Sequence, residues 1–505
     1  MHDRRDTPAV PPPDATRPTR DRNRDRRRAR PQRAPDDGAT GLSRRNATEP
    51  DEPDEPELLE LRCGSVAAGG SCVARAGDGR VVFVRHGLPG ELVQARVTAV
   101  SARYLRADAV EILEPSAARV EPPCPHAGPG RCGGCDFQHV APSEQRAMKA
   151  ALVMEQLRRI ARVERDVTVE ELTGSPDGLG WRTRVRFAAD LDGRVGMRRH
   201  RSHDVEPVEH CLVAAESVRS TGVETCRWPP GCEVEVLAPV RDPPAPAGPR
   251  ARPGRGRDDL DARDGANAVV SVTLHGRARA TPPPRPLAPA TGLVAGGRVV
   301  RPPGHARADV LGHGFRVSAG SFWQAHRDAP RVLGQAVLDG LEPRRGEAVL
   351  DLFAGVGLFS VLCADAVGPG GRVLAVERDR GACADARHNA RRHPQVEVRE
   401  DHVSPAVVAS LGGFDLVVLD PPREGAGTAL VDCLVSLDPA PRRVAYVACD
   451  PASFARDLAV IAAAGWTTTS LRAFDQFPMT EHVELVAIVE PPATARRATR
   501  AGGAA

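Results

Sequence analysis

Four side chains that could bind or react each come at the end of a short apolar run in the second half of the chain. They are Asp351, Glu377, Asp420 and Cys449. The runs have the length of buried strands and alternate with helical patterns, which predicts an α/β fold built on a doubly wound, Rossmann-like parallel sheet. Because ligands of such sheets bind beyond the carboxyl ends of the strands, we expect these four side chains to line one cleft.

A glycine turn follows the first run. Residues 349–360 read VLDLFAGVGLFS, and Gly355 and Gly357 can turn sharply and press their backbone against a ligand because they lack a Cβ. Glu377, at the end of the second run, can accept both hydroxyl groups of a ribose. The turn lacks the third glycine of a dinucleotide fingerprint. Together with the VER and DPPR segments, it favours S-adenosylmethionine over a nicotinamide cofactor.

Cys449 and Glu484 provide a nucleophile and a base for methylation at carbon. Cys449 precedes the helix start at Asp450, and a helix N-terminus favours a thiolate. A thiolate that adds to carbon 6 of uracil makes carbon 5 nucleophilic, and a base must later remove the proton on carbon 5. Glu484 is the predicted base, with Glu481 and His482 as rivals. The alternatives are that Cys449 is a buried core cysteine and that Glu484 is an ordinary strand glutamate.

The segment DPPR at 420–423 bears on the class of acceptor. Two prolines rigidify the loop that carries Asp420. Related motifs that serve amine methylation place an aromatic residue after the prolines, whereas this chain has Arg423. The motif therefore disfavours an amine-type methyltransferase, which stays as an alternative.

Three cysteines lie close together in a Gly/Pro-rich loop, CPHAGPGRCGGCDFQHV. They are Cys124, Cys132 and Cys135, and Cys211 is the candidate for a fourth ligand. Four thiolates suit either a [4Fe-4S] cluster or a structural zinc ion, and the spacing does not separate the two. The alternative is that these cysteines lie close together in the sequence by chance.

The composition divides the chain into folded and unfolded parts. Alternating strands split by glycine turns predict a small OB-like barrel that resembles a TRAM domain, an RNA-binding module. Charged, apolar-poor ends predict disordered tails. The predicted parts are a tail (1–56), the barrel (57–115), a β-rich central domain (116–314) with a flexible insertion near 238–265, the methyl-donor domain (315–492) and a tail (493–505).

The basic residues of the 505-residue chain are almost all arginine. Lys149 is the sole lysine, and the net charge is +3. Arginine suits phosphate contacts, although a coding bias explains the excess equally well. No run approaches the roughly 20 apolar residues of a membrane span, and the N-terminus lacks the apolar core of a signal peptide. We therefore expect a cytoplasmic protein with no membrane contact.

Several segments together resemble the RNA uracil-5 methyltransferase family over residues 57–490. They are FWQAH, DLFAGVGLFS, VERD, LDPPREG, YVACDP and FPMTEHVE, in that order. The resemblance implies that Cys449 is the nucleophile, that Glu484 is the base and that the four cysteines hold a [4Fe-4S] cluster. The contacts that it implies for S-adenosylmethionine are Gln324, Phe353, Glu377, Asp401 and Asp420, besides the glycine turn.

The resulting expectation is methylation of carbon 5 of a uridine in structured RNA by a monomer, with rRNA favoured over tRNA. The target base must leave its stack to reach the cleft. The alternative from another class is a non-catalytic RNA-binding iron–sulfur protein. Three features depart from the family pattern: the segment between Cys124 and Cys132 is longer than usual, Asp450 stands where asparagine is common, and residues 238–265 have no recognised counterpart.

Overall fold

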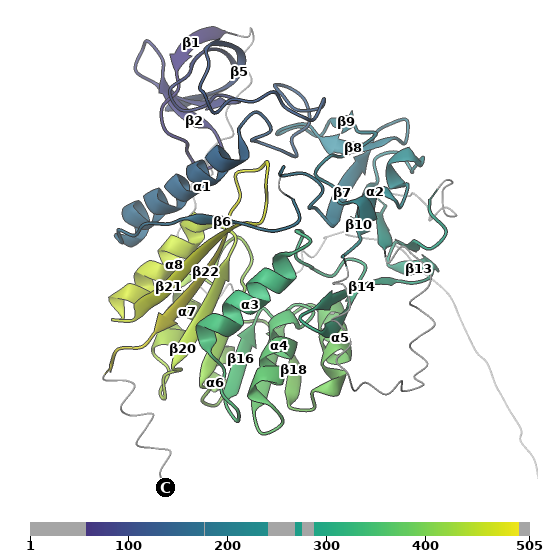
Figure 1. The fold of residues 1–505 in the computed structure, drawn as a ribbon, viewed down its shortest axis with the longest axis vertical. Coiled ribbons are helices and arrows are strands. Elements are labelled where there is room, and N and C mark those ends of the chain that lie inside the picture. The colour runs from purple at the N-terminus through teal and green to yellow at the C-terminus, as the bar shows by residue number, and fades with distance from the viewer. Residues whose placement is uncertain (1–56, 176, 241–267, 275–286, 494–505) are drawn as a thin grey trace, which may run out of the picture. The chain divides into compact units, whose positions relative to one another are not determined.

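The computed structural model describes residues 57–175, 177–240, 268–274 and 287–493, whose strands form four sheets (Figure 1). The predicted tail 1–56, nearly all of the tail 493–505 and most of the insertion near 238–265 lie outside these residues. In the described part, no helix is long and apolar enough to cross a bilayer.

The first sheet contains the five strands expected between residues 57 and 115. Its order is β1-β4-β5-β3-β2. Alternate side chains of these strands, such as Val82, Val84, Leu105 and Ala107, point into one small apolar core, as the period of two in the sequence predicts. The strands are β1 (Leu58–Arg62), β2 (Cys72–Arg75), β3 (Val81–Arg85), β4 (Leu92–Val100) and β5 (Tyr104–Glu114).

The second sheet has seven strands in the order β13-β12-β11-β10-β7-β8-β9. The β7–β8 hairpin turns at Gly193, where φ is +75° and a Cβ would strike the carbonyl of Trp228. A short helix, α2 (Glu216–Arg219), follows β9. The strands are β7 (Arg184–Ala189), β8 (Val195–Arg198), β9 (Val205–Pro207), β10 (Glu233–Leu237), β11 (Val269–Thr273), β12 (Gly292–Ala295) and β13 (Arg298–Arg301).

The third and fourth sheets form the C-terminal region. A two-stranded hairpin, β14 (His305–Val310) and β15 (His313–Ser318), precedes an eight-stranded sheet of order β18-β17-β16-β19-β20-β22-β21-β6. Strands β18 to β20 of that order run parallel, and β22 is antiparallel to both neighbours. The strands of this sheet are β6 (Val169–Glu171), β16 (Ala348–Leu352), β17 (Arg372–Glu377), β18 (Val396–Glu400), β19 (Leu416–Leu419), β20 (Arg443–Ala448), β21 (Thr467–Asp475) and β22 (Glu484–Glu490).

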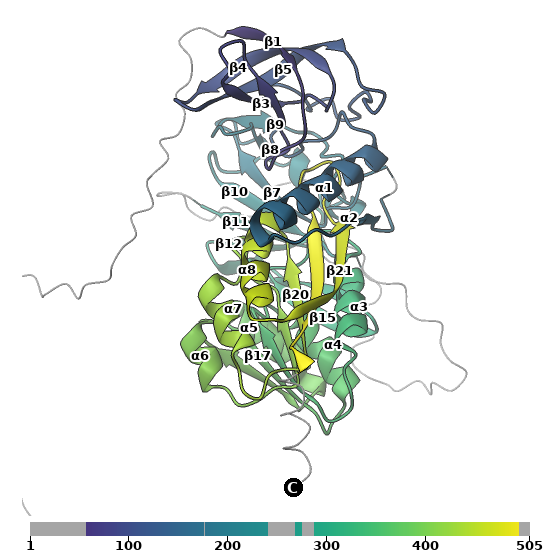
Figure 2. The same cartoon turned by 90° about the vertical axis from the view of Figure 1, so that its left-hand side faces the viewer.

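Helices cover both faces of the eight-stranded sheet (Figure 2), as the sequence predicts for a doubly wound fold. Neighbouring residues of one strand, such as Val349 and Leu350, belong to two different cores. One core packs α3, α4 and α5, and the other packs α1, α6, α7 and α8. The helices are α3 (Ala329–Leu341), α4 (Leu358–Val367), α5 (Arg380–Asn389), α6 (Pro405–Ser410), α7 (Thr428–Val435) and α8 (Pro451–Ala463).

One segment that the sequence grouped with the central domain joins this last sheet. Helix α1 (Pro142–Gln156), continued by a π-helical turn at Leu157–Ala161, packs against α8. Strand β6 (Val169–Glu171) then pairs in parallel with β21 through Val169 and Ala473. Residues far apart in the chain therefore complete the edge of the sheet beside β21 and β22.

Candidate active site

Cys449 lies directly after β20 and before α8. The side chain of Asp450 caps this helix, since its Oδ1 accepts a hydrogen bond of 2.7 Å from the Ser453 amide. Burial, together with the carboxyl groups of Glu484 and Asp420, raises the pKa of the Cys449 thiol to about 12. The N-terminus of α8 follows Cys449 and favours the thiolate, whereas burial and the two carboxyl groups favour the neutral thiol.

Glu484 is the first residue of β22 and is almost fully buried, opposite Phe474 of β21. Burial raises its pKa well above the ordinary value, and Asp420 adds to the shift. The two rival residues are engaged elsewhere. Glu481 accepts a hydrogen bond from the Gly69 amide, and His482 lies 3.0 Å from Arg423.

Asp420 follows β19 and faces a pair of glutamines. Burial raises its pKa to about 7, and the charge of Asp351 adds to the shift. The Gln324 Nε2 atom lies 3.5 Å from Asp420 Oδ2, at the long limit of a hydrogen bond. Gln476 Nε2 donates to Gln324 Oε1 at 2.8 Å. The sequence did not single out Gln476, because nothing in its motif marks a loop glutamine as part of a site.

The glycine turn adopts the conformation that the sequence predicts. Phe353, Gly355 and Gly357 all have positive φ, at +62°, +54° and +85°. A Cβ on Gly357 would meet Ala386 of α5 at 3.3 Å, whereas a Cβ on Gly355 would meet nothing within 4 Å. The backbone at Gly355 therefore borders open space, as an approaching ligand requires.

Two carboxylates lie beside this turn at the ends of β17 and β18. Glu377 Oε2 accepts a hydrogen bond of 3.0 Å from the Gly355 amide. Asp401 donates its own amide to the Glu377 carbonyl at 2.9 Å. Its carboxylate is held by Arg399 at 2.8 Å, and this hydrogen bond lowers the pKa of Asp401.

Asp351 does not lie at the end of its strand, contrary to the sequence expectation. It is the fourth of the five residues of β16 and is fully buried. Its Oδ2 accepts a hydrogen bond of 2.5 Å from the Ser360 hydroxyl of α4, and burial raises its pKa to about 7. The apolar run continues by one residue past Asp351, so the carboxyl group faces α4 within the core.

Two family models match separate parts of this chain. A TRAM domain model matches residues 64–110, and a model described as tRNA (Uracil-5-)-methyltransferase matches residues 408–490. A relative from Streptomyces avermitilis, named as an uncharacterized RNA methyltransferase, is 45% identical over 86% of this chain and 99% of its own. The 23S rRNA (uracil(1939)-C(5))-methyltransferase RlmD of Shewanella sp. (strain MR-7) is 31% identical over 82% of this chain and 91% of its own.

The chain belongs to the RNA uracil-5 methyltransferase family. Among solved structures, the Pyrococcus abyssi tRNA (uracil-54, C5)-methyltransferase, determined with S-adenosyl-L-homocysteine, shares the fold with a TM-score of 0.60. That match covers 85% of this chain and 99% of the other at 21% identity. The fold is thus a Rossmann-like methyltransferase domain with an N-terminal TRAM domain, and S-adenosylmethionine is the methyl donor of the enzyme.

The four cysteines predicted as metal ligands come from two separate segments of this methyltransferase. All four are free thiols. Burial raises the pKa of Cys132 to about 11 and of Cys135 to about 12, and the charge of Cys211 adds to both shifts. Cys124 also interacts with Cys132. Within the described residues, however, no three side chains lie close enough to hold a single metal ion.

Two of these sulfur atoms already accept hydrogen bonds. The Gly134 amide donates to Cys132 Sγ and the Gln138 side chain to Cys135 Sγ, both at 3.4 Å. Such N–H donors stabilise negative charge on sulfur, as the ligands of a metal cluster require. The Cys132 and Cys135 thiols therefore have the N–H donors that metal ligands require. Their spacing, however, is not that of a site for a single metal ion.

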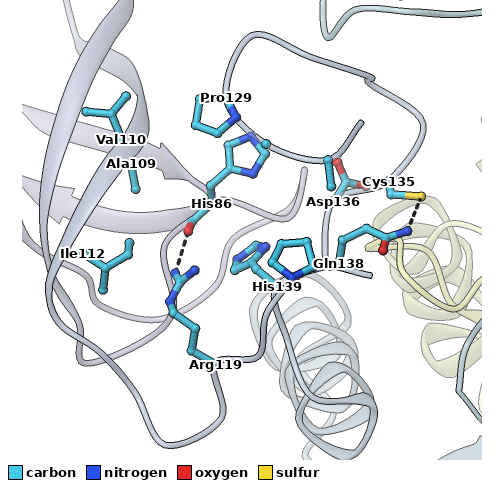
Figure 3. A pocket seen from close by; sticks show the side chains of 13 residues that line it. His86, Ala109, Val110, Ile112, Arg119, Pro129, Cys135, Asp136, Gln138 and His139 are labelled. Atoms are coloured by element: carbon cyan, nitrogen blue, oxygen red, sulfur yellow. Dashed lines mark hydrogen bonds between the residues drawn. The ribbon is translucent and has the colours of Figure 1, made fainter. Parts of the chain in front are cut away.

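The cysteine loop also borders a cavity of about 190 Å³ next to β5 (Figure 3). Figure 3 shows His86, Gln138 and His139 around it, with the Arg119 guanidinium donating to the His86 carbonyl at 2.7 Å. Burial lowers the pKa of His86 to about 3 and of His139 to about 4, so both rings are neutral. Cys449 and Glu484 do not line this cavity, so it is separate from the active site.

The arginines of the central sheet, which could contact RNA phosphates, have acidic neighbours. Arg184 and Arg186 both bind Glu235, and Arg198 binds Glu233. Arg186 remains more than half exposed in its pair, so its guanidinium can still meet a phosphate. These pairs reduce the positive charge that the sheet presents.

Proposed function

We propose that this enzyme methylates carbon 5 of a uridine in ribosomal RNA through a covalent bond between Cys449 Sγ and carbon 6, with Glu484 as the general base. The observation that supports the proposal most is the convergence of Cys449, Glu484 and Asp420, from three neighbouring strands, on one end of the sheet. The carboxyl groups of Glu484 and Asp420 add to the raised pKa of Cys449, and Asp420 adds to that of Glu484.

The proposed reaction has three steps. The Cys449 thiolate adds to carbon 6, and the electron pair of the C5–C6 double bond moves toward carbon 5 and the O4 carbonyl. Carbon 5 attacks the methyl group of S-adenosylmethionine, whose sulfur leaves with its bonding electrons as neutral S-adenosylhomocysteine. Glu484 then takes the proton from carbon 5, the double bond re-forms, and the thiolate is expelled.

The raised pKa values fit a site that is completed by its substrates. Without them, burial disfavours the charged forms of Cys449, Glu484 and Asp420. The methyl donor carries a positive sulfonium charge, and an opposite charge nearby favours ionised carboxylates and thiolates. We therefore propose that donor binding beside Asp420 lowers these pKa values before the RNA base reacts.

The donor is proposed to bind along the ends of β16, β17 and β18. Gly355 and Gly357 would offer their backbone, and Glu377 would accept the ribose hydroxyls. Glu377 Oε2 now accepts the Gly355 amide, so ribose binding would share or replace that bond. The remaining donor contacts are proposed for Gln324, Phe353, Asp401 and Asp420.

The four cysteines are proposed to hold a [4Fe-4S] cluster. A single zinc ion with bonds of about 2.3 Å needs thiolates roughly 3.8 Å apart, and no described group of three ligands is spaced for one ion. A four-iron cluster separates its thiolates further, and the charge of Cys211 adds to the raised pKa of both Cys132 and Cys135. Iron and sulfide analysis after anaerobic purification tests this assignment, and a colourless protein loaded with zinc would contradict it.

Ribosomal RNA is proposed as the substrate because the relatives named RlmD, two at 31% identity, act on 23S rRNA by their names. The family model carries a tRNA name, so tRNA is the alternative. Mapping of 5-methyluridine in RNA from a deletion strain distinguishes the two. Loss of the modification from tRNA alone would overturn the choice of rRNA.

A 5-fluorouridine RNA tests the covalent mechanism. Fluorine at carbon 5 cannot leave as a proton, so the wild-type protein should stay attached to the methylated RNA on a denaturing gel. Cys449→Ala should form no adduct, whereas Cys433→Ala, which changes a partly buried cysteine of α7, should form it normally. An adduct with Cys449→Ala would refute the nucleophile, and methyl transfer that survives Cys449→Ser would indicate amine-type chemistry.

A further inference from the structure

Lys149 is the only lysine among 69 lysine and arginine residues, and it is fully buried on α1. Its ammonium group donates to Asp475 Oδ1 at 2.5 Å and to the Phe477 carbonyl at 3.0 Å. A buried ammonium is costly unless it is paired and hydrogen-bonded. Among the described residues, Lys149 meets that condition through Asp475, the last residue of β21, and Phe477, in the loop that connects β21 to β22.

The two partners of Lys149 stand on either side of Gln476. The Gln476 side chain donates to Gln324 Oε1 at 2.8 Å, and its own Oε1 is buried with no hydrogen-bond partner in the described part of the chain. Only one end of this amide is therefore anchored through its own atoms. Lys149 binds the Asp475 side chain just before Gln476 and the Phe477 carbonyl just after it, so Lys149 helps to fix where Gln476 lies.

The contacts continue from Gln476 into the active site. Gln324 directs its Nε2 toward Asp420 Oδ2 while its Oε1 accepts from Gln476. An amide side chain can turn over and exchange its oxygen and nitrogen unless its partners oppose this. Because Gln476 donates and Asp420 accepts, the Gln324 amide has one preferred orientation.

We propose that Lys149 and Gln476 are positioning residues, which orient the Gln324 amide for the methyl donor from outside the active site. This inference rests on the proposed role of Gln324 in donor binding. It predicts that both residues affect the affinity for the donor, while RNA binding and the chemical step at Cys449 change little. Neither Lys149 nor Gln476 belongs to any of the family-like motifs of the sequence.

The type of residue at position 149 follows from the same geometry. An ammonium is a compact donor that two oxygens and close packing can satisfy. A guanidinium has five N–H groups, and two oxygen partners would leave several of them buried and unpaired. Arginine, which replaces lysine everywhere else in the chain, therefore does not fit this position. We expect Lys149→Arg to lower the affinity for the methyl donor.

Gln145 provides a matched control on the same helix. It lies one turn before Lys149 and holds another part of the same loop, since its Oε1 accepts from the Met479 amide at 2.9 Å. Its Nε2 donates to the Phe137 and Val140 carbonyls at 3.0 and 2.8 Å. Gln145 supports the loop, and its hydrogen bonds among the described residues go to Phe137, Val140 and Met479 rather than to Gln476 or Gln324, so Gln145→Met should lower stability without changing donor affinity.

The test measures S-adenosylhomocysteine binding by calorimetry on the full-length protein. Gln476→Met keeps the side-chain volume and removes the donor group, and we expect binding about tenfold weaker, the effect of one lost hydrogen bond. In turnover assays, KM for S-adenosylmethionine should rise by a similar factor, while kcat at saturating donor and RNA affinity stay within about twofold. Equal binding by Gln476→Met and the wild type would overturn the proposal.

Lys149 is tested in a variant that leaves no unpaired charge. Lys149→Met with Asp475→Asn removes both members of the buried pair, which avoids the large cost of removing one. This double variant should also bind S-adenosylhomocysteine about tenfold more weakly. Wild-type affinity in it would remove Lys149 from the proposal, as would an equal loss in Gln145→Met. A wild-type protein that binds the ligand but forms no 5-methyluridine would instead refute the proposed function.

Discussion

Cys449 and Cys135 are both partly buried thiols, and burial raises the pKa of each to about 12, yet the groups around them differ in kind. Cys449 has two carboxyl groups as neighbours, Glu484 and Asp420. Cys135 has other thiols and an amide N–H that points at its sulfur. A carboxyl group can move a proton, whereas thiols and N–H donors can share and stabilise charge around a metal. The neighbours, rather than the pKa, separate the proposed nucleophile from the proposed ligand.

The two sites also differ in the elements that hold them. The residues around Cys449 stand at the ends of hydrogen-bonded strands, so their positions follow from the sheet. The cysteine loop has little regular structure and depends on close backbone contacts. A Cβ on Gly133, for example, would lie 2.8 Å from the His200 amide nitrogen. We therefore expect the first site to be formed without its ligands and the second to tighten when a cluster binds.

Glu484→Gln should have a larger effect on turnover than the changes at Cys135 and Asp450. The amide cannot accept the proton from carbon 5, so turnover should fall about 10³-fold, within the usual range for a lost general base. Addition and methyl transfer do not need this base, so a covalent complex with ordinary RNA should accumulate on a denaturing gel. If turnover fell with no such complex, Glu484 would act at an earlier step, and the assignment as base would be wrong.

The pH dependence of adduct formation tests the protonation state of Cys449. Because burial and the two carboxyl groups raise its pKa, little thiolate exists at neutral pH, and the thiolate fraction grows about tenfold per pH unit below the pKa. We expect donor binding to lower this pKa but to leave it above neutral pH, so the adduct rate with 5-fluorouridine RNA should rise between pH 6 and pH 8 under single-turnover conditions. The raised pKa of Glu484 should also make the rate of full turnover increase with pH. A flat profile would mean that bound substrates have already produced the thiolate.

Much of the first site could be predicted from the sequence, because parallel strands buried on both faces are continuous apolar runs and their ends mark the ligand edge. Glu377, Asp420 and Cys449 all follow this rule. Asp351 breaks it, since the run continues to Leu352 and the carboxyl group turns to Ser360. A run shows where a strand lies but not at which residue the pairing stops.

Contacts between distant segments could not be predicted in the same way. Strand β6 pairs with β21, three hundred residues later, because α1 packs on α8 and brings the chain to that edge. Lys149 reaches Asp475 and Phe477 through the same arrangement. Met479, with φ of +65°, also lacks any local signal, since the amides of Asp136 and Phe137 hold its carbonyl. Tertiary contacts of this kind leave no spacing pattern in the sequence.

Cys135→Ser should have a moderate effect on turnover, smaller than the effect of a change at the site around Cys449. Loss of one thiolate should remove the iron from the purified protein and lower the melting temperature by several degrees, because the loop would lose a crosslink. Turnover should fall by less than about tenfold under conditions where the protein is folded, since no step of the reaction uses this sulfur. A loss as large as that of Glu484→Gln would show that the two sites are not independent.

Asp450→Asn should produce the smallest change. Asparagine caps a helix as well as aspartate does, so the melting temperature should stay the same. The charge of Asp450 is a minor contributor to the raised pKa of Cys449, after burial, Glu484 and Asp420. Its removal should lower that pKa slightly and speed adduct formation at pH 7 by about two- to threefold.

Asp450→Ala separates the cap of α8 from the charge. It removes the hydrogen bond from the Ser453 amide and should cost about 1 kcal/mol of stability. Its effect on the adduct rate should match that of Asp450→Asn, because both changes remove the same negative charge from beside the thiol. If the asparagine variant reacted faster and the alanine variant did not, the cap would position Cys449. A slower reaction in both would mean that the Asp450 carboxylate contacts the RNA base itself.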